Sequence, residues 1–292
     1  MAKGAPTPKP QPTKPSGASP PSSSQSSTSS RSIGVVRGTI AQGEKIGIYG
    51  PGGIGKTELV ASLPQVGLDP LFLDLDQGTM GIDVARATLD DGSLAYSFED
   101  VRAALQGIAL SGDFDAIVID TFSSLEDRIR EWVIDNVPHE KGRMVRRIED
   151  YGFGKGFSHI FEAAMLILQD LDAIARRGIH CIVVCHQCTE KVPSAEVDDY
   201  YEYQPRLQSP PKTGKLRERV FEWCNHFFRI DHDRSVNDDG RVAKGDVRSI
   251  HTVRTTTAWA KHRTIPNGRE FPEVIPYPKG SHELWDVIFG EE

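Results

Sequence analysis

The sequence predicts an α/β protein with a mostly parallel central sheet flanked by helices. Three observations support this fold class. An apolar segment at 45–49 runs directly into a glycine-rich loop, later apolar runs end in aspartate, and segments with helical spacing separate these runs. Continuous apolar runs are typical of strands buried on both faces, as in parallel sheets covered by helices.

Residues 1–31 differ from the rest of the chain in composition. They are dominated by Pro, Ser, Thr, Gly and Gln, and they carry basic residues but no acid. Such a segment cannot bury enough apolar surface to offset the entropy of ordering it. We therefore expect a disordered basic tail at 1–31 and one folded domain at 32–292. A solubilising role is favoured for the tail over electrostatic tethering to DNA or acidic partners.

Composition sets broad limits on function. The 292 residues are 38% hydrophobic, which suffices for a substantial core, and the net charge of −7 excludes a globally basic surface. A local basic groove for nucleic acid remains compatible with this charge. No apolar run approaches the ~18 residues of a membrane span, and no apolar leader is evident. The expectation is a soluble, cytoplasmic protein with no membrane partner.

The segment Gly50–Thr57 matches the phosphate-binding pattern G-x-x-x-x-G-K-[ST] in full. Glycines allow successive backbone N–H groups to turn toward a polyphosphate, and the helix expected at 56–63 directs its positive dipole end there. Lys56 would reach the β- and γ-phosphates, and Thr57 would bind Mg²⁺. The alternative is a glycine-rich strand-to-helix turn with a chance GK[ST], and it is disfavoured because the strand before the loop and the helix after it are both expected. The residues expected to bind ATP are Gly50, Pro51, Gly52, Gly53, Ile54, Gly55, Lys56, Thr57 and Glu58.

The remaining elements follow an alternating order. A short strand is expected around 34–40, and the apolar run PLFLDL at 70–75 predicts another. Ser97 is expected to cap a helix whose apolar residues recur at helical spacing. The run FDAIVID ending at Asp120 predicts a buried strand. A long helix at 159–177 then precedes a strand at 179–185.

Aspartates at strand ends are the candidate metal and catalytic residues. Asp120, at the end of a central strand neighbouring the loop, is expected to hold Mg²⁺ opposite Thr57, although such an acid can also be only a helix cap. Asp76 is the candidate for orienting the attacking water, with Asp74 in reserve. Past the strand at 179–185, either His186 or Gln187 is the candidate γ-phosphate sensor, because a shift of one residue exchanges their faces. Either can instead be a turn residue.

The order of these segments resembles that of the RecA-like ATPases over roughly residues 33–275. More specifically, it resembles phage-encoded nucleotide-binding proteins associated with single-strand annealing and recombination. Besides the loop and the strands LFLDLD, FDAIVIDTFSSL and CIVVCHQ, the resemblance rests on YGFGKG (151–156), GIHCIVV (178–184), YQPRL (203–207), EWC (222–224) and AWAKHR (258–263).

The resemblance implies a site shared between subunits. In RecA-like motors, a late pair of basic residues reaches the γ-phosphate of a neighbouring subunit, and Lys261 and Arg263 match this pattern. Strand alternation would place both on one face, where they would stabilise transition-state charge. The alternative is an ordinary exposed basic strand. The implied assembly is a homo-oligomeric ring or filament.

Two long irregular stretches are the candidates for contact with single-stranded DNA. Residues 137–156 interleave five basic residues with Tyr151 and Phe153, which suits phosphate neutralisation and base stacking. Residues 187–219 begin acidic and aromatic and then turn basic. The alternative for each stretch is a solvated lid of mixed charge.

The four cysteines allow a different kind of site. The pattern Cys185-His-Gln-Cys188, with Cys224 further on, is only half of a zinc-binding pattern. Reduced core thiols are favoured.

Together these features predict a Mg²⁺-dependent, RecA-like ATPase that acts on single-stranded DNA in phage recombination, annealing or replication, with a single-strand-binding protein as a possible partner. In this reading residues 32–292 form the ATPase domain, located in the cytoplasm of a bacterial host. Alternatives are a hexameric helicase or helicase loader, a P-loop small-molecule kinase, and a nucleotide-gated module without hydrolysis. The last is kept because relatives usually have Glu where this chain has Asp76.

Overall fold

The computed structural model describes residues 1, 34–35, 37–38, 41–94, 96–193, 198–236, 242–263 and 270–290. The chain divides into two units, 1–39 and 40–292. Beyond Met1, the predicted tail at 1–31 lies outside the described residues. The described positions within the predicted strand at 34–40 do not form a strand. The following paragraphs concern the second unit.

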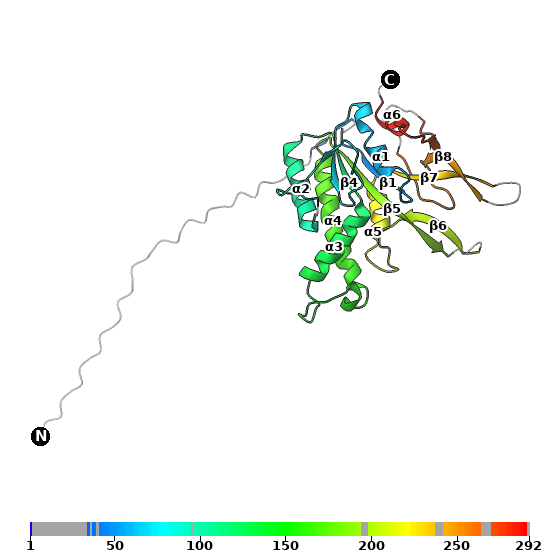
Figure 1. Ribbon diagram of the computed structural model, residues 1–292. Helices are drawn as coiled ribbons and strands as arrows, with labels where there is room; N and C mark the ends of the chain where they lie inside the picture. The colour runs from blue at the N-terminus through cyan, green and yellow to red at the C-terminus, as the bar shows by residue number, and fades with distance from the viewer. Residues whose placement is uncertain are drawn as a thin grey trace. The chain divides into compact units, whose positions relative to one another are not determined.

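The second unit alternates strands and helices (Figure 1). Its elements are β1 (Lys45–Gly50), α1 (Lys56–Val60), β2 (Pro70–Asp74), β3 (Ala85–Arg86), α2 (Phe98–Ser111), β4 (Ala116–Asp120), α3 (Phe122–Asn136), α4 (Lys155–Ala175), β5 (His180–Val192), β6 (Tyr200–Pro205), α5 (Leu216–Trp223), β7 (His226–Val236), β8 (Val242–His251), β9 (Val274–Pro276) and α6 (Glu283–Phe289), with short 3-10 turns at Leu63–Val66 and Ile148–Tyr151.

Within the described residues, nine strands form one sheet in the order β3-β2-β4-β5-β1-β7-β8-β9, with β6 paired to β5. Pairing is parallel from β3 to β7 and antiparallel for β8, β9 and β6. The predicted mostly parallel α/β fold is therefore confirmed. The expectation that the Asp120 strand neighbours the phosphate loop is wrong, because β5 lies between β1 and β4.

The central strands bury alternate residues in two apolar layers. On β1, Tyr49 belongs to the layer under α2, α3, α4 and α5, whereas Ile46 and Ile48 belong to the layer under α1 and α6. Figure 1 shows α2, α3 and α4 gathered over one side of the sheet. Since both faces are covered, both sets of alternating positions must be apolar, which explains the continuous apolar runs.

Local capping signals fix the starts of two helices. Ser97 caps α2 as predicted, since its side chain accepts the Asp100 N–H and the Asp100 carboxylate accepts the Ser97 N–H. Thr121 caps α3, so this helix begins immediately after Asp120. Helix α4 begins at Lys155, four residues before the predicted start, because Gly154 ends the preceding turn with φ 76°.

Two predictions about the later chain are wrong, and one hairpin was missed. Residues 187–219 are not one irregular stretch, because β5 continues to Val192 and pairs with β6 before α5 begins. The strand expected to carry Lys261 and Arg263 is reduced to isolated bridges, of which Lys261 makes one with Phe227. The hairpin of β7 and β8 was not predicted. Antiparallel strands exposed on one face carry alternating polar residues, which weakens their apolar signal.

The cysteines belong to the core. Cys181, Cys185 and Cys224 are buried free thiols, and burial raises the pKa of each. Among the described residues, no three side chains of the His, Cys, Asp or Glu type come together in a way suited to a metal ion. In the same part of the chain, no helix has the length and apolar character needed to cross a membrane.

A buried acid joins α3 to the segment after β6. Glu126 is 5% exposed, and its two carboxylate oxygens accept the Gln208 N–H at 3.2 and 3.1 Å. Arg130 lies 3.4 Å from the same carboxylate. Burial raises the pKa of Glu126 to about 7, although the Gln208 hydrogen bond and the charge of Arg130 act in the opposite direction.

We predict that Glu126 makes stability fall as pH rises. Between the ordinary pKa of 4.5 and the folded-state pKa of about 7, the folded protein retains a proton that the unfolded chain releases. The stabilising contribution is thus complete below 4.5 and is lost as pH rises through about 7. Glu126→Gln cannot ionise. As pH rises across this window, the unfolding free energy of the wild type should therefore fall relative to that of Glu126→Gln by up to about 3 kcal/mol.

Urea unfolding at about pH 5 and about pH 8 measures this difference. Glu131→Gln is the matched control, because Glu131 lies on the same helix but its side chain is 64% exposed. Parallel pH profiles for the wild type and Glu126→Gln would show that the carboxyl titrates normally.

Candidate nucleotide site

The phosphate-binding loop leaves β1 at Gly50 and enters α1 at Lys56, as predicted. Gly55 has φ 100°, a left-handed conformation that side chains with a Cβ adopt rarely. The Lys56 ammonium is buried and donates to the carbonyl oxygens of Gly50 at 3.1 Å and Pro51 at 2.9 Å. Burial lowers its pKa, because these neutral acceptors do not replace hydration of the charge. A buried cation held in this way suits an anionic ligand.

Thr57 and Asp120 meet across the sheet. The Thr57 hydroxyl donates to Asp120 Oδ2 at 2.6 Å, although β5 separates their two strands. A Cβ on Gly78 would lie 3.3 Å from Thr57 Oγ1 and 3.8 Å from Asp120 Oδ2, so the glycine keeps space open beside this pair. Hydroxyl and carboxylate oxygens are the hard ligands that Mg²⁺ prefers. Mg²⁺ usually keeps several waters and substrate oxygens, so two protein ligands fit it.

The electrostatics of Asp120 favour a nearby cation. Burial and the charges of Asp74 and Asp76 outweigh the Thr57 hydrogen bond and the charge of Lys56, so the pKa of Asp120 is raised to about 6. A positive charge beside Thr57 would lower that pKa and stabilise the ionised carboxylate. The site thus fits a divalent cation, with Thr57 and Asp120 as the residues that would hold it.

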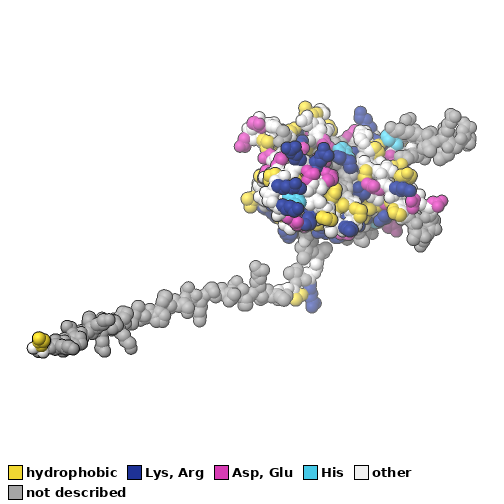
Figure 2. All heavy atoms as spheres, turned by 90° about the horizontal axis from the view of Figure 1, so that it is seen from below, with side chains coloured by type: hydrophobic (Ala, Val, Ile, Leu, Met, Phe, Trp, Pro, Cys, Tyr) yellow, Lys and Arg dark blue, Asp and Glu magenta, His cyan; other side chains and the backbone are white. Residues whose placement is uncertain are grey.

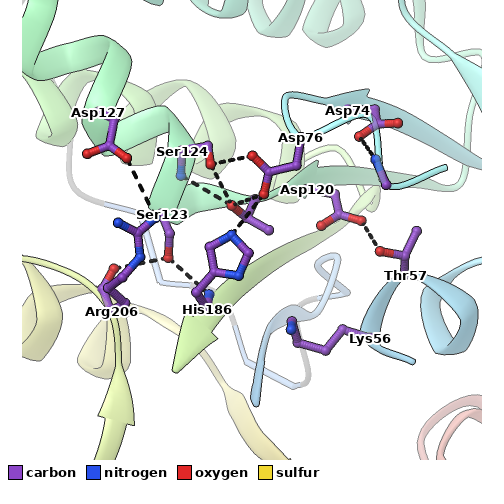
Figure 3. A network of polar contacts seen from close by, with 12 residues as sticks. Lys56, Thr57, Asp74, Asp76, Asp120, Ser123, Ser124, Asp127, His186 and Arg206 are labelled. Atoms are coloured by element: carbon purple, nitrogen blue, oxygen red, sulfur yellow. Dashed lines mark hydrogen bonds and ion pairs between the residues drawn. The ribbon is translucent and has the colours of Figure 1, made fainter. Parts of the chain in front are cut away.

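Asp76 lies at the centre of a second set of contacts (Figure 3). Its carboxylate accepts hydrogen bonds from Thr121 Oγ1 at 2.9 Å and from Ser124 Oγ, and it lies 3.0 Å from His186 Nε2. Burial alone would raise its pKa, but the hydrogen bonds of His186, Ser124 and Thr121 outweigh burial and lower it to about 2. Asp76 is therefore a permanent anion that orients His186, and it is a weak proton acceptor.

Asp74 and Gln187, the alternatives to Asp76 and His186, make different contacts. Asp74 is fully buried, and its oxygens accept the N–H groups of Gly78 and Thr79 at 2.9 Å each, so it stabilises the turn that carries Asp76. Gln187 accepts a hydrogen bond from Arg229 at 3.0 Å. The structure therefore brings Asp76 and His186 together, and it places Asp74 and Gln187 in other contacts.

Helix α3 connects this cluster to the chain after β6. Ser123 Oγ accepts the His186 N–H at 3.0 Å and donates to the Arg206 carbonyl at 3.0 Å. Arg206 also lies 3.5 Å from Asp127. The sequence analysis did not predict these contacts, and it did not select Thr121 and Ser124 as site residues. The signal was present, because the polar run Thr121-Phe-Ser-Ser124 follows directly after a buried strand.

Lys261, Arg263 and Glu58 were predicted as site residues, but they do not lie on the side of the loop that would face the phosphates. Lys261 bonds through its backbone to Phe227, which pairs with Gly47 near the start of β1, and its ammonium donates to the Glu222 carbonyl at 3.3 Å. Arg263 is exposed two residues further on. Glu58 lies 3.2 Å from Arg248 of β8. A role for Lys261 and Arg263 would therefore have to be played at the site of another subunit.

Comparison with known proteins places this geometry in a family. No curated protein matches the chain. The family model described as an AAA domain matches residues 42–264, which include the loop, Asp76, Asp120 and His186. The match covers most of the chain and agrees with the phosphate loop, the strand-end acids and the mostly parallel sheet. The chain therefore belongs to the AAA domain family and is an AAA-type P-loop NTPase.

Proposed function

We propose that this protein is a Mg²⁺-dependent ATPase of RecA-like type that acts on single-stranded DNA in recombination, annealing or replication of a phage, as a homo-oligomer. The observation that carries the ATPase part is the joint position of Lys56, Thr57 and Asp120, with Asp76 and His186 beside them. The DNA part rests on the surface described below and on the resemblance of the ordered motifs.

The chemistry follows from the charges of these residues. Mg²⁺ held by Thr57 and Asp120 would neutralise charge that develops on the phosphates. Lys56 would place a desolvated positive charge on the transferring phosphoryl group. Asp76 would orient the attacking water together with His186, which it holds by a hydrogen bond. His186 would sense the γ-phosphate, since its N–H donates to Ser123 at the start of α3 and its ring contacts Asp76.

The surface for DNA joins parts of both stretches predicted to contact it. Phe153 and Phe157 line a pocket of about 330 Å³ with residues 210–213. The segment 210–213 is held beside α4 by Gln208, whose Nε2 donates to the Phe157 carbonyl at 2.8 Å. Phe153 is fully exposed. Tyr151, by contrast, is buried, and its hydroxyl donates to the Val133 carbonyl at 2.9 Å, so it does not stack bases.

The charges around this pocket suit a polyanion. Lys212 lines the pocket, and Arg143 and Arg146 line a second hollow of about 280 Å³ on the same α3–α4 connection. Figure 2, which views the molecule from below, shows Lys and Arg side chains interleaved with apolar and acidic ones. Exposed aromatic rings with nearby cations are the pattern of sequence-tolerant binding to single strands.

The alternatives differ in measurable behaviour. A hexameric helicase or helicase loader would unwind or translocate along DNA. A small-molecule kinase would turn over ATP as a monomer without DNA. A nucleotide-gated module would bind ATP without hydrolysing it.

We predict that single-stranded DNA stimulates ATP hydrolysis. Lys56→Ala should abolish turnover, because it removes the phosphate-facing charge. Arg263→Ala should lower turnover by about 10³-fold or more if the residue acts as an arginine finger between subunits. Steady-state hydrolysis with and without single-stranded DNA measures these effects, with Arg128→Ala as the matched control, because the Arg128 side chain on α3 is 41% exposed.

Monomeric turnover that is independent of DNA and unaffected by Arg263→Ala would contradict the DNA and oligomer parts of the proposal. ATP binding without hydrolysis under every condition would instead favour the nucleotide-gated module.

We predict that Asp76 and His186 act as one unit. Asp76→Asn and His186→Ala should each lower kcat by about 10²-fold with little change in ATP affinity, because both remove the same oriented group. The double variant should be no slower than the slower single variant. A larger loss in Gln187→Ala than in His186→Ala would assign the sensor role to Gln187 instead.

We predict that Phe153→Ala weakens binding to oligo(dT) by about 5- to 100-fold, the usual contribution of one base-stacking aromatic residue. The exposed ring makes no core contribution, so the thermal unfolding midpoint should stay unchanged. Leu110→Ala is the matched control, because Leu110 is also highly exposed but lies on α2. Wild-type affinity in Phe153→Ala would exclude this surface as the DNA contact, even if hydrolysis is confirmed.

A further inference from the structure

Two side chains from the C-terminal part of the second unit donate to the back of the phosphate-binding loop. Arg248 Nη1 of β8 donates to the Ile54 carbonyl at 2.9 Å. The Tyr277 hydroxyl, one residue after β9, donates to the Gly55 carbonyl at 2.8 Å. Both acceptors belong to the two peptide groups that immediately precede Lys56.

The two donors are held in place by each other and by α1. The Arg248 guanidinium lies 4.2 Å from the centre of the Tyr277 ring, and its Nη1 lies 3.2 Å from Glu58 Oε2. Tyr277 is 1% exposed. A Cβ on Gly55 would lie only 2.3 Å from Arg248 Nη1, so the guanidinium packs directly against the loop backbone.

These contacts act on the loop's phosphate-binding groups through the peptide bond. The peptide that presents the Ile54 carbonyl carries the Gly55 N–H at its opposite end, and the Gly55 carbonyl is paired in the same way with the Lys56 N–H. A donor on the carbonyl side polarises the peptide and strengthens the N–H as a donor. It also holds the left-handed Gly55, whose flexibility would otherwise allow many loop conformations.

We propose that Arg248 and Tyr277 are positioning residues that hold the phosphate-binding loop in its nucleotide-binding conformation. The ATP site then extends beyond the region 42–264 matched by the family, since Tyr277 lies after it. Trp285 of α6 anchors the same segment, because its Nε1 donates to the Leu59 carbonyl at 2.8 Å on α1. The segment from β8 to α6 thus supports the site from behind.

This arrangement couples the segment to the nucleotide in both directions. If the contacts of Arg248 and Tyr277 raise the population of the binding-competent loop, ATP binding must stabilise these contacts by the same factor. We expect amides of residues 274–290 to exchange hydrogen more slowly when a non-hydrolysable ATP analogue is bound. This effect requires neither DNA nor hydrolysis.

Tyr277→Phe tests the proposal with the smallest change, because it removes one hydroxyl and keeps the ring under Arg248. Calorimetric titration with the non-hydrolysable analogue and Mg²⁺, well below the unfolding midpoint, should show about two- to tenfold weaker binding. Arg248→Ala should weaken binding at least as much, and Arg248→Lys should recover part of the loss by retaining the charge.

Tyr151→Phe separates positioning from general stability. It also removes a buried hydroxyl that donates to a carbonyl, but at a distant helix, so it should lower the unfolding midpoint without changing nucleotide affinity. Wild-type affinity in Tyr277→Phe, or equal losses in Tyr277→Phe and Tyr151→Phe, would overturn the proposal. So would unchanged exchange at 274–290 on binding of the analogue.

Discussion

The hydrogen bond between Thr57 and Asp120 depends on one constraint, the register of the parallel strands. Gly50 is paired with His186, Asp120 is paired with Val184, and Asp74 is paired with Asp120. These pairings bring the carboxyl ends of β1, β2 and β4 to one edge of the sheet, beside the point where the parallel pairing of β5 ends. Polar side chains at or just after these positions therefore meet there, although they lie far apart in the chain. A shift of one residue in any of these pairs would turn a functional side chain to the other face.

Much of this edge was predictable because buried parallel strands leave a strong signal. Each central strand contains a short apolar run with polar residues at or soon after its end, so Asp76, Asp120 and His186 could be selected from the sequence, and Thr57 could be selected from the loop pattern. The strand order could not, because pairing between β1 and β5 rather than β4 depends on crossovers that local patterns do not specify. Strand β6 and the β7–β8 hairpin were missed for a related reason. Their alternating polar residues resemble those of irregular segments.

The choice between neighbouring candidates also required the structure. Asp74 and Asp76 are two residues apart and equivalent in the sequence. The Asp74 carboxylate accepts backbone N–H groups of the turn that follows it, whereas the Asp76 carboxylate accepts hydrogen bonds from three side chains. His186 and Gln187 were separated only by the direction of each side chain. The clearest omission, Ser123, acts through a hydroxyl that bridges two backbone groups. The polar run after the buried strand was visible in the sequence, but the two backbone groups that Ser123 bridges were not.

The phosphate loop is therefore held from two sides by different kinds of group. On the side of Asp120, carboxylates face the loop. Burial raises the pKa of Asp120, and a bound cation would stabilise its ionised form. Arg248 and Tyr277 instead donate to carbonyl oxygens of the loop. A glycine-rich loop gains its binding geometry only at the cost of backbone freedom. Contacts that restrict this freedom before the ligand arrives reduce the entropy that binding must overcome. The antiparallel strands at the edge of the sheet, which add nothing to the row of strand-end acids, are placed to provide that restriction.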